Sequence, residues 1–398
     1  MNVLITDGNC RSALAATRSL GRQGVHVVVG DESADNISAV SRFCSEKCAY
    51  PSPYISSQDF LEAVHKIIQN YHIDLLLPMS DVALDNILSH ENTFSPHILR
   101  ALPTYKAYAA VSDKHNLLGL ATDIGMQIPE STLIFNESQF YEIIDKVRYP
   151  VVIKPSRSRL LINNIYVPTS VHYSASKEDL KHLYMTVPYL KEPFLLQQRI
   201  CGPGLGLFAL FDKGNPIAYF SHMRIREKPP SGGASVLCKS IPVDENIRGK
   251  AELLLKKIQW NGVVMLEYKV DANTGTPYLI EINGRFWGSL QLSIDAGIDF
   301  PYILYKIANG CNGCINSIYE HYQTGIMSRW LLGDLDNLYL SSFKKRNDAL
   351  STLCKLKNIW QFLKYNGRYC YFDVLRIDDL FPFINEVKQY LTSMFHSK

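Results

Sequence analysis

Apolar runs alternate with helical patterns along the first hundred residues. Strands are expected at 3–6, 25–29 and 73–78, and helices at 11–20 and about 58–70. Buried strands that alternate with amphipathic helices are typical of a parallel sheet with crossover helices. We therefore expect a small doubly wound sheet in this part of the chain.

A different pattern follows Pro103, with one helical stretch and then apolar runs at short spacing. Helices are expected at 111–125 and 244–258, and strands at 149–154, 194–198, 205–211, 215–222, 233–241, 262–270 and 276–282. Strands this closely spaced are usually joined as antiparallel hairpins. The chain is therefore expected to combine α/β with α+β architecture.

The composition is that of a folded protein. Of 398 residues, 46% are hydrophobic and 20% charged, which excludes a disordered chain. The formal net charge of +3 is too small for nucleic acid to be the main partner. The chain has no signal-peptide pattern and no apolar run of the roughly 20 residues that span a bilayer. With nine cysteines at this length, we expect a cytoplasmic protein without a transmembrane segment.

Asp31 ends the second expected strand, where an acidic residue would bind the ribose of a dinucleotide. The preceding turn, DGNCR at 7–11, does not contain the G-x-G-x-x-G pattern of such sites. We therefore expect a structural domain that contributes one wall of a substrate cleft.

Two neighbouring expected strands terminate in side chains that can bind a metal ion. Glu267 follows the apolar run GVVML, and Glu281 and Asn283 come at the end of the next run. If the two strands pair, the carboxylates and the amide converge. These hard oxygen donors suit Mg²⁺, which completes its shell with phosphate oxygens and water. The alternative is that these acids are solvated and inert.

Two lysines add to this constellation. Lys154 ends the run YPVVIK before a proline, so its ammonium is held at a strand end where it can meet a phosphate. Lys114 follows Asp113 at a helix start. Each lysine taken alone is better explained by a solvated surface position, and Lys114 is the weaker signal of the two.

The order of the segments resembles the ATP-grasp superfamily: DK at 113–114, YPVVIKP, FLLQQ, a glycine-rich turn, then Glu267 and E-x-N-x-R at 281–285. The similarity covers about residues 1–310 and is greatest to the carbamoyl-phosphate-synthase-like and biotin-carboxylase-like branch, particularly to stand-alone bacterial members with REKPPSGG and EINGRFWGS. It implies a Rossmann-like pre-ATP-grasp domain at 1–108 and a two-lobed ATP-grasp fold. The small lobe would be 109–192, the large lobe with the metal site 193–310, and a mostly helical C-terminal extension 311–398.

The resemblance gives each matching position a role. Lys114 and Lys154 would contact the phosphates of ATP. The hinge along the adenine edge would be Gln197, Gln198, Arg199 and Ile200, and the ligands of Mg²⁺, or of Mn²⁺, would be Glu267, Glu281 and Asn283. Arg285 would stabilise an acyl-phosphate or its transition state, because a guanidinium binds phosphoryl oxygens through two bonds. The alternative for Arg285 is a salt bridge to one of the same glutamates.

A second basic segment reads HMRIREKPPSGG. Alternation along a strand would place Arg224, Arg226 and Lys228 on one face, next to a turn whose bare amides can approach an anion. The matching segment of ATP-grasp enzymes lies over the phosphate and the carboxylate. The substrate-binding set would be Arg224, Lys228, Ser231, Gly232 and Gly233, and the catalytic set Lys154, Arg226 and Arg285. A surface strand with an ordinary hairpin turn is the alternative.

By this resemblance the protein would be an ADP-forming ligase that uses ATP and Mg²⁺ to activate a carboxylate as an acyl-phosphate and joins it to an amine. Its partners would be small-molecule carboxylate and amine substrates, and a homodimer is compatible with this assignment. A bicarbonate-activating carboxylase or carbamoyl-phosphate-type enzyme is the second interpretation. A nucleotide-binding regulatory protein with a decayed site is the third, favoured by the glycine-free loop 155–164 and by Gln197 and Gln198 in place of a hinge acid.

Past residue 310 the resemblance fades. Between 339 and 368, seven Lys and Arg residues stand against the single acid Asp348. Such a segment is typical of a basic amphipathic helix on a membrane surface or a partner. The other interpretation is a helical cap that packs Leu353, Leu356, Trp360 and Leu363 onto the core. We favour the cap.

Overall fold

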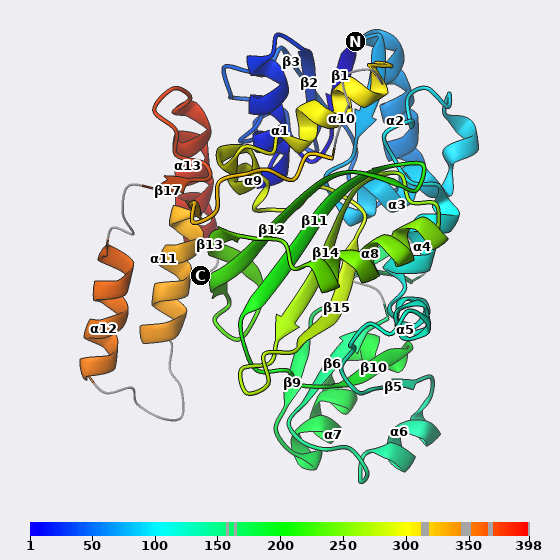
Figure 1. Ribbon diagram of the computed structural model, residues 1–398, viewed down its shortest axis with the longest axis vertical. Coiled ribbons are helices and arrows are strands. Elements are labelled where there is room, and N and C mark those ends of the chain that lie inside the picture. Colours follow the sequence, from blue (N-terminus) through cyan, green and yellow to red (C-terminus); the bar gives the residue numbers. More distant parts are fainter. Residues whose placement is uncertain (157–158, 163–164, 312–317, 344–351, 365–368, 397–398) are drawn as a thin grey trace.

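The computed structural model describes residues 1–398 apart from 157–158, 163–164, 312–317, 344–351, 365–368 and 397–398 (Figure 1). The α-helices are α1 Arg11–Arg22, α2 Ser57–Asn70, α3 Asp81–Ser89, α4 Tyr105–Ser112, α5 Lys114–Asp123, α6 Glu137–Ile143, α7 Lys177–Thr186, α8 Glu245–Lys257, α9 Leu290–Ala296, α10 Phe300–Ala308, α11 Leu331–Ser342, α12 Thr352–Leu363 and α13 Phe381–His396. The strands are β1 Asn2–Ile5, β2 His26–Asp31, β3 Glu46–Ala49, β4 Ile73–Leu77, β5 Ser131–Ile134, β6 Val151–Pro155, β7 Arg159–Ile162, β8 Ile165–Pro168, β9 His172–Ser174, β10 Phe194–Gln198, β11 Gly204–Asp212, β12 Asn215–Lys228, β13 Ala234–Ile241, β14 Gly262–Val270, β15 Pro277–Asn283, β16 Met327–Arg329 and β17 Cys370–Phe372.

The first sheet, here called the N-terminal sheet, has the order β3-β2-β1-β4 with parallel pairing throughout. Three of its strands lie where the apolar runs predict them. The fourth, β3, has the sequence EKCA and a mostly exposed pattern, so it has no hydrophobic signature. Strand β3 is an edge strand, and pairing with β2 rather than burial defines it.

Two larger sheets and a two-stranded sheet of β7 and β8 form the α+β section. The small sheet has the order β5-β10-β6-β9 and is antiparallel. The large sheet has the order β15-β14-β11-β12-β13-β16-β17, in which only the pairing of β16 with β17 is parallel. The large sheet runs through the centre of Figure 1, with the N-terminal sheet on one side and the small sheet on the other. The expected combination of α/β and α+β architecture is confirmed, whereas the boundaries at 108, 192 and 310 stay predictions.

One hydrophobic core joins the N-terminal sheet to the large sheet. It contains Val3 and Val27 of the first sheet together with Phe208 and Met265 of the second, and Trp287 completes it. A separate core packs α6 and α7 on the small sheet. The small sheet therefore has its own hydrophobic support, while the other two sheets share theirs.

The single helix expected at 111–125 is wrong, because two helices meet there. Helix α4 ends at Ser112, and α5 begins at Lys114. Between them the Asp113 carboxylate accepts hydrogen bonds from the backbone amides of His115 and Asn116. An aspartate that caps a helix in this way favours a new helix start over a continuous helix.

The C-terminal residues connect the N-terminal sheet to the edge of the large sheet. The buried Arg18 on α1 donates to the Asp379 carboxylate at 2.8 Å and to three backbone carbonyls at 373–379. Asp379 also accepts from the Ser41 hydroxyl and the Arg42 amide. Each member of this pair therefore has its polar atoms satisfied away from water, although both side chains are about 1% exposed.

The expectation of a C-terminal cap over the core is wrong for α12. Leu353, Leu356, Trp360 and Leu363 are 56–78% exposed, so these side chains do not pack on the core. Helix α12 lies outside α11 at the edge of the molecule (Figure 1). No helix among the described residues is long and apolar enough to cross a membrane.

We expect Arg18→Ala to lower the free energy of unfolding by about 3–5 kcal/mol, because it leaves Asp379 buried without its cation. The matched control is Arg22→Ala on the same helix, since its partner Asp378 is 53% exposed and surface pairs contribute less than about 1 kcal/mol. Urea unfolding of both variants measures the difference. Equal losses would contradict the role given to the buried pair.

Candidate active site

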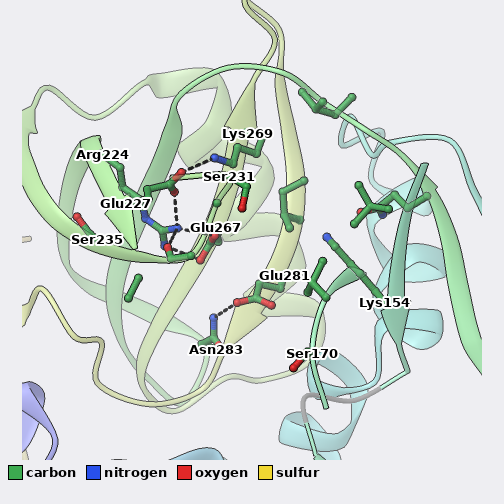
Figure 2. A pocket seen from close by; sticks show the side chains of 18 of the residues that line it. Lys154, Ser170, Arg224, Glu227, Ser231, Ser235, Glu267, Lys269, Glu281 and Asn283 are labelled. Atoms are coloured by element: carbon green, nitrogen blue, oxygen red, sulfur yellow. Dashed lines mark hydrogen bonds and ion pairs between the residues drawn. The ribbon is translucent and has the colours of Figure 1, made fainter. Parts of the chain in front are cut away.

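A cavity of about 600 Å³ is lined by residues of the small sheet, of the large sheet and of α1 (Figure 2). Among the described residues that line it, seven are cationic and three acidic. The cations are Arg11, Lys114, Lys154, Arg199, Arg224, Lys269 and Arg285, and the acids are Glu227, Glu267 and Glu281. An excess of cations in a cleft favours an anionic occupant.

The predicted pairing of the two carboxylate strands is observed. Glu267 on β14 lies directly opposite Glu281 on β15, and Asn283 lies opposite Met265. The Asn283 amide donates to the Glu281 carboxylate at 2.9 Å. Burial alone would raise the pKa of Glu281, but Lys114, Asn283, Lys154 and Arg285 outweigh it and the pKa is lowered, so the carboxylate stays charged. One carboxylate and one amide thus form a fixed pair on the cavity wall.

Glu267 is held by a guanidinium. Arg224 donates to its two carboxylate oxygens at 2.7 and 2.6 Å, with the Arg224 side chain only 8% exposed. The same guanidinium donates to Glu227, which also accepts from Lys269. A carboxylate oxygen has two lone-pair directions, so this geometry leaves Glu267 able to bind a cation through the second one.

The side-chain oxygens of Glu267, Glu281 and Asn283 on β14 and β15 are of the kind that binds Mg²⁺. No group of three or more His, Cys, Asp or Glu side chains suited to a metal occurs among the described residues. A metal here would therefore bind Glu267 and Glu281 with the carbonyl oxygen of Asn283, and would take its remaining ligands from phosphate and water. Such an incomplete protein shell is usual for Mg²⁺ sites that act on nucleotides.

Lys154 faces these carboxylates from the small sheet. Figure 2 shows its ammonium pointing across the cavity toward Glu281. The residue is 8% exposed. Burial lowers the pKa of Lys154, the charge of Glu281 raises it in part, and with the smaller effects of Lys114 and Glu267 the pKa is about 8. An ammonium so weakly hydrated is ready to bind a phosphate.

The four hinge residues predicted for the adenine edge, Gln197, Gln198, Arg199 and Ile200, all line the cavity. The Gln197 amide is already used, because it donates to the Ser131 hydroxyl at 2.9 Å. Its side chain therefore stabilises the small sheet. The Gln198 backbone amide is also used, because it donates to the carbonyl of Glu130 at 2.8 Å, whereas Arg199 and Ile200 follow as further lining residues.

The turn at 231–233 covers the cavity beside Arg224. Gly232 has a φ of 130°, and a Cβ atom at Gly233 would lie 2.3 Å from the carbonyl oxygen of Lys228, so both positions require glycine. Tyr173 of the small sheet donates to the carbonyl of Ser231 at 3.2 Å. The turn therefore links the small sheet to the large sheet beside the cavity.

The expectation that Arg224, Arg226 and Lys228 share one face is wrong. The pairing of β12 with β13 is irregular between Arg224 and Arg226, because one extra residue, Ile225, stands in β12. Such a bulge reverses the alternation beyond it. Arg226 instead donates to both oxygens of the buried Asp334 at 2.6 Å. Arg226 therefore does not face the cavity, and the catalytic role predicted for it is wrong.

Lys228, predicted to bind substrate, is also directed away from the cavity. Its ammonium donates to Asp336 on α11 and lies 5.3 Å from the ring of Trp330. Neither Lys228 nor Arg226 belongs to the described lining of the cavity. The second half of the basic strand fixes the C-terminal helices instead.

Arg285 lines the cavity but pairs with neither glutamate. Its Nε and Nη2 atoms donate to the two oxygens of Asp81 at 2.9 Å, and Nη1 donates to the Phe286 carbonyl. Asp81 lies in the first turn of α3. These three bonds leave two of the five N–H groups of Arg285 for a ligand.

Asp31, at the end of β2, uses one carboxylate oxygen to accept a hydrogen bond from the backbone amide of Asn9. This bond supports the expectation that the N-terminal sheet is a structural domain and that Asp31 does not bind a ribose.

Arg11, Tyr173, Glu227 and Lys269 are among the cavity residues that have no role in the sequence-based assignment. Lys269 lies two residues beyond Glu267 on the same strand, so alternation alone predicts that it shares the face. Arg11 donates to the Ser235 carbonyl at 3.2 Å and lies over the ring of Trp330. Its location depends on the packing of α1 against the large sheet, which no local pattern reveals.

Of the loop after Lys154, the structure describes the hairpin formed by β7 and β8. Arg157 lies outside the described residues, as does the side chain of Arg159.

Comparison with known protein families gives a match over part of the chain. Residues 209–329 match the family described as ATP-grasp in the biosynthetic pathway with Ter operon. No curated protein matches the chain in sequence. The matched segment holds β12 to β15 and so includes both glutamates, Asn283 and Arg285.

Solved structures with the same fold extend the likeness beyond this segment. Biotin carboxylase from Campylobacter jejuni has a TM-score of 0.64 at 16% identity over 82% of this chain and 74% of its own. L-amino acid ligase from Bacillus licheniformis has a TM-score of 0.60 at 16% identity over 77% and 73%. N5-carboxyaminoimidazole synthetase from Staphylococcus aureus has a TM-score of 0.65 at 14% identity over 91% and 96%. The chain thus has an ATP-grasp fold.

We expect the Lys154 ammonium to titrate near pH 8, well below the ordinary value of 10.5, because the folded protein buries it. Since the folded-state pKa is the lower one, this group makes folding more favourable as the pH rises from about 8 to 10.5. NMR titration of ¹³C-methylated lysines measures the pKa, and Lys154→Arg identifies the resonance. Glu281→Gln should lower the midpoint further, and a wild-type midpoint near 10.5 would contradict the buried state.

Proposed function

We propose that this protein is an ADP-forming ligase that uses ATP and Mg²⁺ to activate a small-molecule carboxylate as an acyl-phosphate and joins it to an amine. One observation carries the proposal. Lys114 of α5, Lys154 of the small sheet, and Glu267, Glu281 and Asn283 of the large sheet line a single cavity, although these elements are separate in the chain. Such a cavity suits a nucleotide triphosphate with a divalent cation.

The nucleotide would lie between the hinge and the carboxylates. The backbone at 199–200 would meet the base, and Lys154 and Lys114 would hold the phosphates as point charges. Mg²⁺, when bound by Glu267, Glu281 and Asn283, would neutralise charge on the transferred phosphoryl group. The described lining contains four more cations than acids, which offsets the charge of a triphosphate.

In the first step an oxygen of the substrate carboxylate attacks the γ-phosphorus of ATP. The bond from that phosphorus to the β–γ bridging oxygen breaks, and its electron pair leaves with ADP. In the second step the amine attacks the acyl carbon, phosphate leaves with the C–O electron pair, and the nitrogen loses a proton to give the amide. Arg285 would donate its two remaining N–H groups to the phosphoryl oxygens.

Arg285 is well prepared for that role. Asp81 and the Phe286 carbonyl fix the guanidinium plane before substrate binds. A donor that is already oriented costs no reorganisation during the reaction. Because Asp81 belongs to α3, the N-terminal part of the chain takes part in orienting the catalytic arginine.

The similar structures support two related reactions. The L-amino acid ligase favours the joining of a carboxylate to an amine. The biotin carboxylase, solved as a complex with β-γ-ATP, and a 2-oxoglutarate carboxylase domain, solved with MgADP and bicarbonate, favour the second candidate, a bicarbonate-activating enzyme. The two candidates are distinguished by the substrate that stimulates ADP release, which is a carboxylate with an amine for the ligase and bicarbonate for the carboxylase.

We expect Glu281→Gln to reduce ADP release about 100-fold or more, because it removes a charge from the metal site while keeping the shape of the side chain. ADP and phosphate release are measured with Mg²⁺, pooled amino acids, amino sugars, small carboxylates and bicarbonate. Glu245→Gln, which changes an exposed carboxylate on α8, is the matched control and should retain full activity.

Three outcomes separate the candidates. Stimulation by a carboxylate together with an amine, lost in Glu281→Gln, supports the ligase. Stimulation by bicarbonate alone supports the carboxylase. Binding of MgATP by calorimetry without turnover in any pool counts against both reactions and favours the regulatory interpretation.

Arg11 offers a second test, directed at the substrate end of the cavity. Its contact Ser235 lies on the opposite side of the cavity from Lys154 in Figure 2. We expect Arg11→Gln to raise the KM of the carboxylate or amine about tenfold and to leave the Kd of ATP unchanged, because one charge-assisted contact is lost. Arg22→Gln on the same helix is the control. A tenfold change in the Kd of ATP would contradict the assignment of Arg11 to the substrate end.

A further inference from the structure

Large apolar side chains are exposed mainly at the C-terminal end of the chain. Of the large hydrophobic residues that are exposed in the described part, nine precede α11 and sixteen lie in α11 or beyond it. The region from α11 to the end is less than a fifth of the chain. Scattered exposed hydrophobics are ordinary, whereas a concentration of this kind marks an interaction surface.

Helix α12 presents the clearest part of this surface. Leu353, Leu356, Trp360 and Leu363 recur at spacings of three and four residues, so they lie along one side of the helix. Their exposed fractions are 78%, 56%, 60% and 71%. These four side chains are here called the α12 face.

The orientation of α12 is fixed by its opposite side. Arg226 and Arg329, which share the buried Asp334, donate to the carbonyls of Gln361 and Phe362 in the last turn of α12. The Asn358 amide donates to the Ser342 hydroxyl of α11. The Arg329 guanidinium also lies 4.4 Å from the centre of the Phe362 ring. The α12 face therefore points away from the protein because specific contacts hold the other side in place.

Cations accompany the α12 face. Helix α12 contains Lys355 and Lys357 and no acidic residue, and Lys364 follows directly with its ammonium 5.2 Å from the Trp360 ring. Over residues 339–368 the sequence has seven Lys and Arg residues and the one acid Asp348. A leucine and tryptophan stripe bordered by lysines is the composition of helices that lie in the plane of a bilayer interface.

A second copy of the chain is a poorer fit to this surface. A twofold contact through the α12 face would bring its lysines against the same lysines of the other copy, and like charges repel. An anionic bilayer satisfies both features, because its acyl chains accept the leucines and its headgroups attract the cations. Helix α12 is also the outermost element on its side (Figure 1), so its side chains can reach a flat surface.

We propose that the α12 face docks the protein on the surface of an anionic lipid bilayer, with α12 lying parallel to that surface. The inference is independent of the proposed ligase activity, because none of its residues lines the cavity. It assigns Arg226 and Arg329 the role of positioning α12 for this contact.

The test is sedimentation of the full chain with vesicles of phosphatidylcholine, or of equal parts of phosphatidylcholine and phosphatidylglycerol. We expect binding to the anionic vesicles and a loss of affinity of about tenfold or more for Leu356→Ser with Leu363→Ser, because less apolar area enters the interface. Lys357→Gln with Lys364→Gln should lower the affinity about tenfold and weaken its salt dependence.

Matched controls change residues of the same type elsewhere. Met185→Ser with Leu253→Ser removes two side chains that are 61% and 60% exposed on α7 and α8. Lys66→Gln with Lys106→Gln removes two exposed cations on α2 and α4. Both control variants should bind the anionic vesicles like the wild type.

Trp360 provides a local readout, since it belongs to the α12 face. Its emission should shift to shorter wavelength with anionic vesicles, and the shift should be lost in Trp360→Phe. Equal loss of binding in the control and α12 variants would overturn the proposal, as would no binding to either kind of vesicle. So would a dimer in sedimentation equilibrium that Leu356→Ser with Leu363→Ser dissociates, because a second copy would then occupy the face.

Discussion

The pairing of β14 with β15 sets two carboxylates side by side, and the rest of the site follows from the need to balance them. Glu267 and Glu281 are direct partners in the sheet, a position where like charges repel. Arg224 compensates the first, and Lys154 and Lys114 lie near the second. Because these cations come from different elements, the balance of charge also brings those elements together. A phosphate with a divalent cation would extend the same balance.

Lys154, which faces Glu267 and Glu281, shows that burying a charge in this site weakens its protonation. Burial lowers the pKa of Lys154, and the glutamates prevent a larger decrease. The ammonium is therefore neither a solvated surface charge nor half of a closed salt bridge. A group in this condition gains from an anionic ligand, which connects the electrostatics of the cavity to the chemistry proposed for it.

The bulge in β12 divides one basic strand between two tasks. Before Ile225, Arg224 faces the cavity and holds Glu267. Beyond it they face the C-terminal helices, where Arg226 holds Asp334 and the last turn of α12. The same short segment thus connects the candidate active site with the helix that carries the exposed α12 face. A bulge is a common means of redirecting side chains beside a functional site.

Sequence alone determined the parts of this protein that depend on local pattern. Apolar runs located β1, β2, β4, β6, β10 and β14, and the order of Lys154, Glu267, Glu281 and Asn283 indicated the ATP-grasp fold, because strand burial and strand-end chemistry are encoded within a few residues. Tertiary structure alone decided the rest. The edge strand β3 is defined by its partner, Arg226 is turned away by a bulge, and Arg11 reaches the cavity through the docking of α1. The exposure of α12 was mispredicted for the same reason: spacing shows that an apolar stripe exists, but only packing determines whether another element covers it.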